Sequence, residues 1–148
     1  MTMDRRNSEG YSDPTAAEAL TNVVLEEKAN KKRYRPLVYI CSPFANNIEY
    51  NTNRACGYCL FAVSEGCIPL APHLHYPQFM DDSDKESREL GLSFALVLLM
   101  KCDAMWVFGD RISDGMAREI AKAKKSGLPI RYFNEKCEEV IRHENSGR

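Results

Sequence analysis

The chain has 148 residues, of which 44% are hydrophobic and 28% are charged, and its formal net charge is -1. This length and composition predict one globular domain with a sizeable core. A net charge near zero gives no electrostatic reason to bind nucleic acid or an anionic membrane, so we expect neither partner. The first residues lack the apolar core of a signal peptide, and the longest apolar run, Leu92 to Met100, is too short to span a bilayer. We therefore expect a cytoplasmic protein.

The six cysteines are scattered along strand-like and helix-like segments, which favours reduced and partly buried thiols. One pair has CxxC spacing, but no second Cys or His pair stands at the distance typical of a zinc site. The pair also lies within a helical pattern rather than at a strand-to-helix junction, which disfavours a redox role. We therefore expect no metal centre. The cysteines are Cys41, Cys56, Cys59, Cys67, Cys102 and Cys137, and the CxxC pair is Cys56 with Cys59.

The chain divides into three parts. Residues 1–34 are polar, with a weak helical stretch from Pro14 to Lys32 and a basic end, which predicts a flexible or partly helical arm or an oligomer clasp. Residues 35–134 carry the alternating pattern of the folded α/β unit. Residues 135–148 are expected to form a C-terminal tail that adds a short helix and then frays.

Four short apolar runs, rich in β-branched and aromatic residues, predict strands at 37–41, 67–71, 104–108 and 129–133. Apolar residues at helical spacing predict a helix from 48 to Gly66, a helix from about 85 to 101, and a helix that carries Glu119 and runs to 125. Strands separated by helices imply parallel pairing through right-handed crossovers. The pattern predicts an α/β three-layer sandwich with a parallel, flavodoxin- or Rossmann-like sheet of four to five strands. The helix at 85–101 is apolar nearly all round in its second half, so we expect it in the core or at a subunit interface.

A polar turn follows the strand at 104–108. Asp110 and Asp114 stand in this turn, and Glu119 follows on the next helix. Ligands of open α/β sheets bind where strands end and helices begin, and carboxylates there suit acid/base or nucleophilic chemistry. Glu119 projects at the edge of the apolar stripe of its helix, where it can face a cleft while partly desolvated. In the alternative, structural interpretation, Ser113 or Asp114 caps the helix and the other carboxylates are solvated.

The loop from residue 72 to 79 is rich in proline, histidine and aromatic residues. In an extended segment, His73 and His75 point the same way and could form a metal pair with Asp81 or Asp82. Alternatively, the loop places His73, Tyr76 or Phe79 against a nucleobase. Simple packing of the loop against Pro72 and Pro77 is the third interpretation.

Polar residues also begin the first helix of the folded unit. Ser42, Asn46 and Asn47 could hold a ribose or a 5′-phosphate through helix N-terminal amides. Asn46 or Asn47 equally suits the role of a helix N-cap.

Three motifs carry a family resemblance. They are Val38-Tyr39-Ile-Cys-Ser-Pro-Phe44 on the first strand, Cys102-Asp103-Ala-Met-Trp-Val-Phe108 on the third, and Gly115-Met-Ala-Arg-Glu119-Ile-Ala-Lys-Ala123 with Gly127-Leu-Pro129-Ile after it. Together they resemble the motifs of the nucleoside 2-deoxyribosyltransferase superfamily, over roughly residues 36–134. The chain is most similar to an uncharacterised bacterial and phage branch of that superfamily, in which Pro-His-Leu-x-Tyr-Pro-Gln-Phe and Trp-Val-Phe-Gly-Asp-Arg-Ile-Ser recur.

The resemblance implies a retaining attack at the anomeric carbon of a nucleoside or nucleotide. It implies that Glu119 is the nucleophile, that Tyr39 orients it by a hydrogen bond, and that Asp103 is structural. Water or a second base would then resolve the glycosyl-enzyme ester, which gives a hydrolase or a transferase. The reaction needs no cofactor and no metal, and the family implies a dimer or a larger assembly.

Two acidic positions of the superfamily are different here. An aspartate is common eight residues before the position of Asp103 and an acidic residue six before the nucleophile, where this chain has Ala95 and Ser113. Substitutes for the missing proton donor are Asp110, Asp114, Asp81 and Asp82, of which we count Asp110 and Asp114 as catalytic candidates. The substrate-binding candidates are Ser42, Phe44, Asn46, His73, Tyr76, Gly109, Gly115 and Met116. The alternatives to an enzyme are a non-catalytic nucleotide-binding module on the same fold and a sensor based on cysteine oxidation.

Overall fold

The computed structural model describes residues 14–81 and 83–142, and its chain forms two compact units, Met1–Tyr34 and Arg35–Arg148. The described part of the first unit is helix α1 (Pro14–Lys32), which begins at the proline and matches the expected helical stretch. Its apolar side chains Leu20, Val23, Val24 and Leu25 are exposed. The earlier residues of the expected arm lie outside the described residues, and the expected three-part division of the chain stays a prediction.

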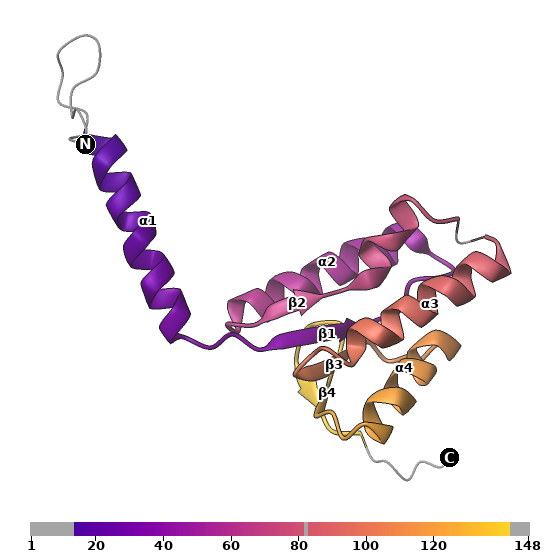
Figure 1. Cartoon of the computed structure of the whole chain (residues 1–148). Coiled ribbons are helices and arrows are strands. Elements are labelled where there is room, and N and C mark those ends of the chain that lie inside the picture. The colour runs from indigo at the N-terminus through magenta and orange to yellow at the C-terminus, as the bar shows by residue number, and fades with distance from the viewer. Residues whose placement is uncertain (1–13, 82, 143–148) are drawn as a thin grey trace. The chain divides into compact units, whose positions relative to one another are not determined.

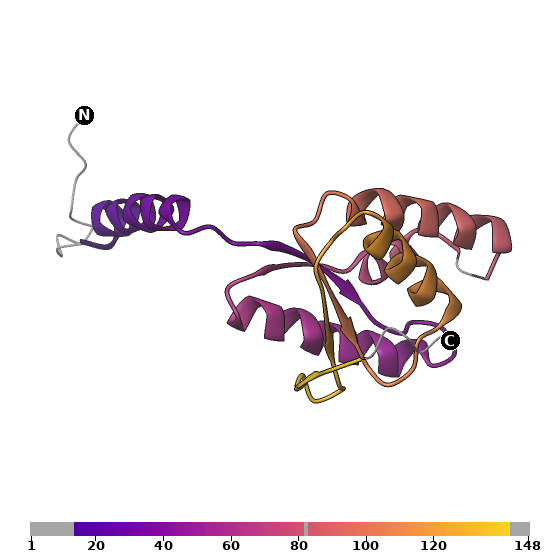
Figure 2. The ribbon, with the colours of Figure 1, turned by 90° about the horizontal axis from the view of Figure 1, so that it is seen from below.

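The second unit is built on a five-stranded sheet with the order β2-β1-β3-β4-β5. Four strands run parallel: β1 (Leu37–Cys41), β2 (Ile68–Leu70), β3 (Ala104–Phe108) and β4 (Ile130–Phe133). Helices cover both faces of this sheet, as Figures 1 and 2 show. The expected α/β sandwich with a Rossmann-like sheet is therefore confirmed.

Within the described part of the chain, the segment after residue 135 forms strand β5 (Glu139–Val140), which pairs antiparallel with β4, and not the expected short helix. Asn134 explains the reversal. Its side-chain oxygen accepts hydrogen bonds from the backbone N–H groups of Lys136, at 2.8 Å, and Glu138, at 2.9 Å. An Asn side chain that binds the following backbone stabilises a tight turn and competes with a helix.

The two faces of β1 serve different layers. Val38 and Ile40 pack with Tyr58 and Ala62 of helix α2 (Ile48–Ser64). Tyr39 and Cys41 point the other way, into a cluster with residues of helices α3 (Lys85–Leu99) and α4 (Asp114–Lys125). A strand buried on both faces has a continuous run of apolar residues in its sequence. For this reason the predicted bounds of β1 and β3 agree with the observed ones. The alternation also aims residues 39 and 41 at α4.

Helix α3 is only half buried, although the sequence indicated an apolar surface nearly all round. Ala95 and Leu99 are buried against the sheet, whereas Leu90, Phe94 and Val97 are 50%, 38% and 58% exposed. The expectation that this helix is buried in the core is therefore wrong for the face that carries these three residues. Its alternative, a subunit interface, stays a prediction.

Side-chain caps fix the start of the two helices next to β1 and β3. Asn47, not Asn46, caps α2 by accepting from the backbone N–H of Tyr50, and Asn46 has a left-handed φ of 80°. Ser113, not Asp114, caps α4 by accepting from the N–H of Met116. Within the described ranges, no helix has the length and apolarity needed to cross a membrane.

Candidate functional site

The carboxyl ends of β1 and β3 form a crevice. From β1 the chain passes through α2 to β2 on one side, while β3 lies on the other side, so the winding of the sheet reverses between β1 and β3. Open α/β sheets bind ligands at such a switch point. Two cavities open there: the first, of about 550 Å³, lies against α3 and α4, and the second, of about 670 Å³, lies against α2.

Glu119 on α4 reaches the end of β1. The Tyr39 hydroxyl donates a hydrogen bond to Glu119 Oε2, and Cys41 Sγ lies 3.4 Å from Oε1. Residues two apart on a strand share one face, so a single strand supplies a donor to each carboxylate oxygen. This is the hydrogen bond that the resemblance implied for Tyr39, together with a thiol contact that the sequence did not reveal.

Electrostatics set the protonation of this group. Burial raises the pKa of the Glu119 carboxyl above its usual range, and the hydrogen bonds from Tyr39 and Cys41 oppose that rise. The pKa of Tyr39 is also raised, first by burial and then by the neighbouring Glu119 charge. Tyr39 therefore keeps its proton and acts as donor, while Glu119 accepts.

The first cavity gathers most of the residues singled out from the sequence. Its wall includes both Tyr39 and Glu119 and, among the other candidates, Ser42, Phe44, His73, Tyr76, Asp114, Gly115 and Met116. Asp81, one of the substitute proton donors, also lines it. Asp82 falls outside the described residues.

The second cavity holds the remaining candidates, Asn46, Gly109 and Asp110. Gly109 has a φ of +99°, a conformation that favours glycine, and the chain turns there after β3. Arg142 donates to the carbonyl oxygens of Gly109, at 3.3 Å, and Asp110, at 3.1 Å. The structure therefore separates Asp110 from the wall that carries Glu119. Phe44, Ala45 and Ser113 line both cavities, which are therefore neighbours.

The histidine loop is not extended. Two short 3-10 turns, Pro72–Leu74 and Tyr76–Gln78, rotate the two histidines apart. His73 Nε2 lies 3.0 Å from Ser42 Oγ, whereas His75 is exposed and packs on the rings of Tyr76 and Phe79. The expectation that both histidines point the same way is wrong.

Burial lowers the pKa of His73 to about 4, so this imidazole is neutral at neutral pH. A neutral imidazole both donates and accepts a hydrogen bond. The described residues contain no group of three or more His, Cys, Asp or Glu side chains placed to hold a metal ion.

Asp103 lies away from this crevice. Its carboxylate accepts a hydrogen bond of 2.8 Å from the backbone N–H of Leu37, at the start of β1. The contact ties the beginning of β3 to the beginning of β1, at the opposite end of the sheet from Glu119, which agrees with the structural role implied by the resemblance.

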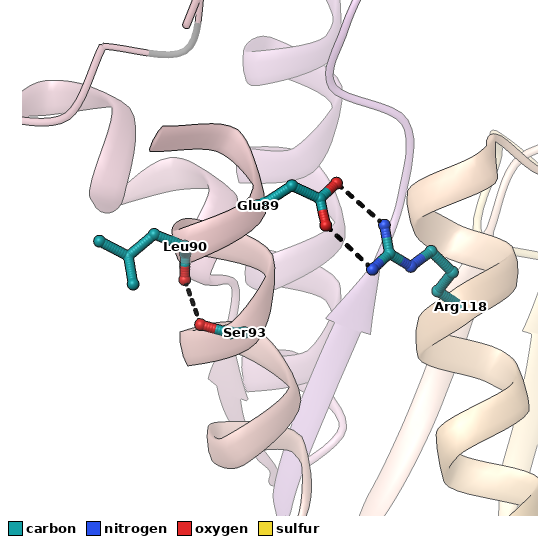
Figure 3. A network of polar contacts seen from close by, with 4 residues as sticks. All are labelled: Glu89, Leu90, Ser93 and Arg118. Atoms are coloured by element: carbon teal, nitrogen blue, oxygen red, sulfur yellow. Dashed lines mark hydrogen bonds and ion pairs between the residues drawn. The ribbon is translucent and has the colours of Figure 1, made fainter. Parts of the chain in front are cut away.

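An ion pair on the first cavity's wall was missed by the sequence analysis. Both terminal nitrogens of Arg118 donate to Glu89, each at 3.1 Å, and join α4 to α3 (Figure 3). Nearby, the Ser93 hydroxyl donates to the Leu90 carbonyl within α3. No spacing pattern in the sequence links two residues so far apart in the chain.

We expect Glu89→Gln to leave the thermal midpoint almost unchanged. Both side chains of the pair are 53% exposed, and an exposed ion pair gains little because water screens it. Thermal denaturation of parent and variant checks this at low salt and at about 1 M salt, where the small difference should vanish. A large loss of stability that persists at high salt would contradict it.

A comparison with family models matches residues 36–133 to a family described as a domain of unknown function (DUF7768), and the chain belongs to this family. Among solved structures it is similar to a 2-deoxyribosyltransferase from the psychrotolerant bacterium Bacillus psychrosaccharolyticus, described as a biocatalyst for nucleoside synthesis. That similarity has a TM-score of 0.56 at 20% identity and covers 72% of this chain and 77% of that one. It confirms the fold relationship. A comparison with curated proteins gave no match.

Proposed function

We propose that this member of the DUF7768 family is an N-glycosidase or 2-deoxyribosyltransferase-like enzyme acting on a nucleoside or nucleotide. One observation carries the proposal: the Glu119 carboxylate, held by hydrogen-bonding partners on β1, lies in the wall of a cavity at the sheet's switch point. A cavity of about 550 Å³ has the size of a small-molecule site. The fold shared with a 2-deoxyribosyltransferase supports the substrate class.

The proposed reaction begins with attack of a Glu119 oxygen on the anomeric carbon. A glycosyl–carboxylate ester bond forms while the bond from that carbon to the base nitrogen breaks, and its electron pair leaves with the base. A proton donor of the site protonates the departing nitrogen, so the base leaves as a neutral molecule. Water then cleaves the ester in a hydrolase, whereas a second base does so in a transferase.

The proton donor in this proposal is Asp114. Asp114 lines the same cavity as Glu119, whereas Asp110 lines the second one. Among the described residues, Asp81 is the other candidate carboxyl on the first cavity's wall outside the ion pair with Arg118. Asp114 is preferred because it begins the helix that carries Glu119 and is therefore held in a fixed relation to it.

The base would lie against the aromatic part of the wall. Phe44 and His73 meet edge to face with centroids 5.9 Å apart, and Tyr76 lies on the same wall. Aromatic faces stack on nucleobases, and neutral His73 can hydrogen-bond a base edge as donor or acceptor. Ser42, bonded to His73, fixes the orientation of the ring.

A non-catalytic nucleotide-binding module is the second candidate. The observation that favours it is the position of Ala95 and Ser113, which both line the first cavity. The resembled superfamily commonly has acidic residues at these positions, so their replacement removes carboxylates from the site without disturbing the fold.

Self-association and a cytoplasmic location complete the proposal. The exposed apolar residues of α3, Leu90, Phe94 and Val97, form a stripe at helical spacing that suits a subunit contact. Size-exclusion chromatography with light scattering tests the assembly: a dimer or larger supports it, and a monomer at all concentrations contradicts it.

The deciding experiment is chromatographic detection of free base. The purified chain and Glu119→Ala are incubated with ribo- and deoxyribonucleosides, with and without a 5′-phosphate and with an acceptor base. Release by the parent and not by the variant supports the enzyme. Release by neither contradicts it for that panel, and thermal stabilisation by the same ligands would then support the binding module.

A further inference from the structure

We infer that Cys41 is a positioning residue for Glu119: its thiol holds one carboxylate oxygen from the buried side while Tyr39 holds the other. The inference rests on the proposed role of Glu119 as nucleophile. It adds a residue that the family resemblance does not assign and that the cysteine pattern did not single out.

The geometry of β1 makes the arrangement rigid. Tyr39 and Cys41 pair in register with Met105 and Val107 of β3, so both are fixed within the parallel ladder. The Tyr39 hydroxyl contacts Oε2, and Cys41 Sγ lies 3.4 Å from Oε1, within reach of a thiol hydrogen bond. Two donors on separate oxygens define the rotation of the carboxylate about its last bond, so the attacking oxygen keeps one direction.

Cys41 acts from behind the site. It is 1% exposed, and it is not among the described residues that line the first cavity, whereas Tyr39 and Glu119 are. A substrate in that cavity would therefore contact the carboxylate and not the thiol. Burial, and then the neighbouring Glu119 charge, raise the pKa of the Cys41 thiol. The thiol stays protonated, which makes it a donor and not a nucleophile.

A weak donor suits this position. A strong hydrogen bond to Oε1 would draw charge from the oxygen and lower its nucleophilicity, while an empty position would leave a buried carboxylate oxygen without a partner. A thiol gives direction with little loss of charge. Cysteine should therefore be better here than either alanine or serine.

Other charged and titratable groups line the cavity around Glu119. Tyr39 faces it from β1, while Asp114 and the Arg118–Glu89 pair lie on the α3 and α4 side of the cavity. Among the described residues, His73, Tyr76, Asp81 and Arg88 are the other titratable or charged members of this wall. All of these are unchanged in a Cys41 variant, so a difference from the parent reports either the thiol contact or the packing around residue 41, and the variants below separate the two.

The test compares Cys41→Ala and Cys41→Ser with a matched control, Cys102→Ala. Cys102 is a buried cysteine of the same core cluster, and its thiol lies 3.5 Å from the Leu98 carbonyl and not against Glu119. The full-length chains are labelled with carbon-13 in glutamate, and the Glu119 carboxyl is titrated by NMR, with Glu119→Gln assigning the signal. Where base release is found, the pH profile of kcat is measured in parallel.

We expect Cys41→Ala to raise the pKa of Glu119 further and to move the acid limb of kcat to higher pH, with kcat at neutral pH falling about fivefold to tenfold. Cys41→Ser should return the pKa to the parent's value or below it, and Cys102→Ala should leave it unchanged. An identical Glu119 titration in parent and Cys41→Ala overturns the inference. So does an equal shift in Cys41→Ala, Cys41→Ser and Cys102→Ala, which would indicate core packing alone.

The titration separates this inference from the proposed function. If the parent releases no base but its Glu119 titration shifts as expected in Cys41→Ala, the contact is supported and the enzymatic proposal fails. If base is released and the titration is insensitive to Cys41, the enzyme stands and the positioning role fails.

Discussion

Glu119→Gln should lower kcat for base release by about a thousandfold or more, because an amide cannot form the glycosyl ester. The substitution keeps the size and shape of the side chain. Its carbonyl oxygen can still accept from Tyr39, so the hydrogen bond at Oε2 has a replacement. Since burial disfavours the charged carboxylate, the neutral amide should not destabilise the fold. The loss should therefore be catalytic and not structural.

The measurement is the initial rate of base release together with the mass of acid-quenched protein. The parent should carry a glycosyl adduct during turnover, and Glu119→Gln should carry none. Glu86→Gln is a suitable control, because Glu86 is an exposed residue in the first turn of α3 and is not among the described residues lining the first cavity. A Glu119→Gln variant that turns over at the parent's rate would exclude the carboxylate nucleophile.

The sheet was predictable because its central strands are buried on both faces. β1 and β3 have nearly every side chain in the core, so each is a short, continuous apolar run, and its β-branched and aromatic residues favour a strand. Parallel pairing followed from the intervening helices. The chain reversal at Asn134 was not predictable from periodicity, since a single side chain binding two backbone N–H groups decides it.

The candidate site was predictable only in part. The helical wheel placed Glu119 at the edge of an apolar stripe, and the family resemblance paired it with Tyr39. Cys41 could have been found from the same strand, because residue 41 lies on the face of residue 39. The resemblance brings Glu119 to Tyr39 but assigns no contact to residue 41, and an apolar strand position is equally typical of an ordinary buried cysteine.

Loops and surface contacts were beyond the sequence patterns. Asp110 and Asp114 are four residues apart, yet they line different cavities because Gly109 has a left-handed conformation and Ser113 caps α4. The backbone of the 72–79 loop forms 3-10 turns instead of an extended segment, which separates His73 from His75. The separation of the two aspartates and that of the two histidines each depend on individual φ values and hydrogen bonds. The spacing of apolar residues in the sequence does not predict these.

Tyr39→Phe has the second large expected effect, a fall in kcat of about tenfold to a hundredfold at neutral pH. Tyr39 is 1% exposed, so phenylalanine fills its space but leaves Glu119 Oε2 without a hydrogen bond. The pKa of Glu119, already raised by burial, loses an interaction that lowers it and rises further. A nucleophile must be ionised, so the acid limb of the kcat profile should move to higher pH.

The same change has a pH-dependent effect on stability, with a sign that follows from linkage. Because the folded-state pKa of Glu119 lies above its ordinary value of 4.5, its contribution to stability is full below that pH and is lost as the pH rises through the folded pKa. Tyr39→Phe raises the folded pKa further, so its deficit against the parent should be largest near neutral pH and shrink toward pH 4.5. Urea denaturation at about pH 4.5 and about pH 7.5 measures this, with Tyr132→Phe, a partly buried tyrosine of the same core cluster, as control. A deficit that is independent of pH would reduce the Tyr39 hydroxyl to a packing role, because only its bond to the ionised carboxylate makes the deficit depend on pH.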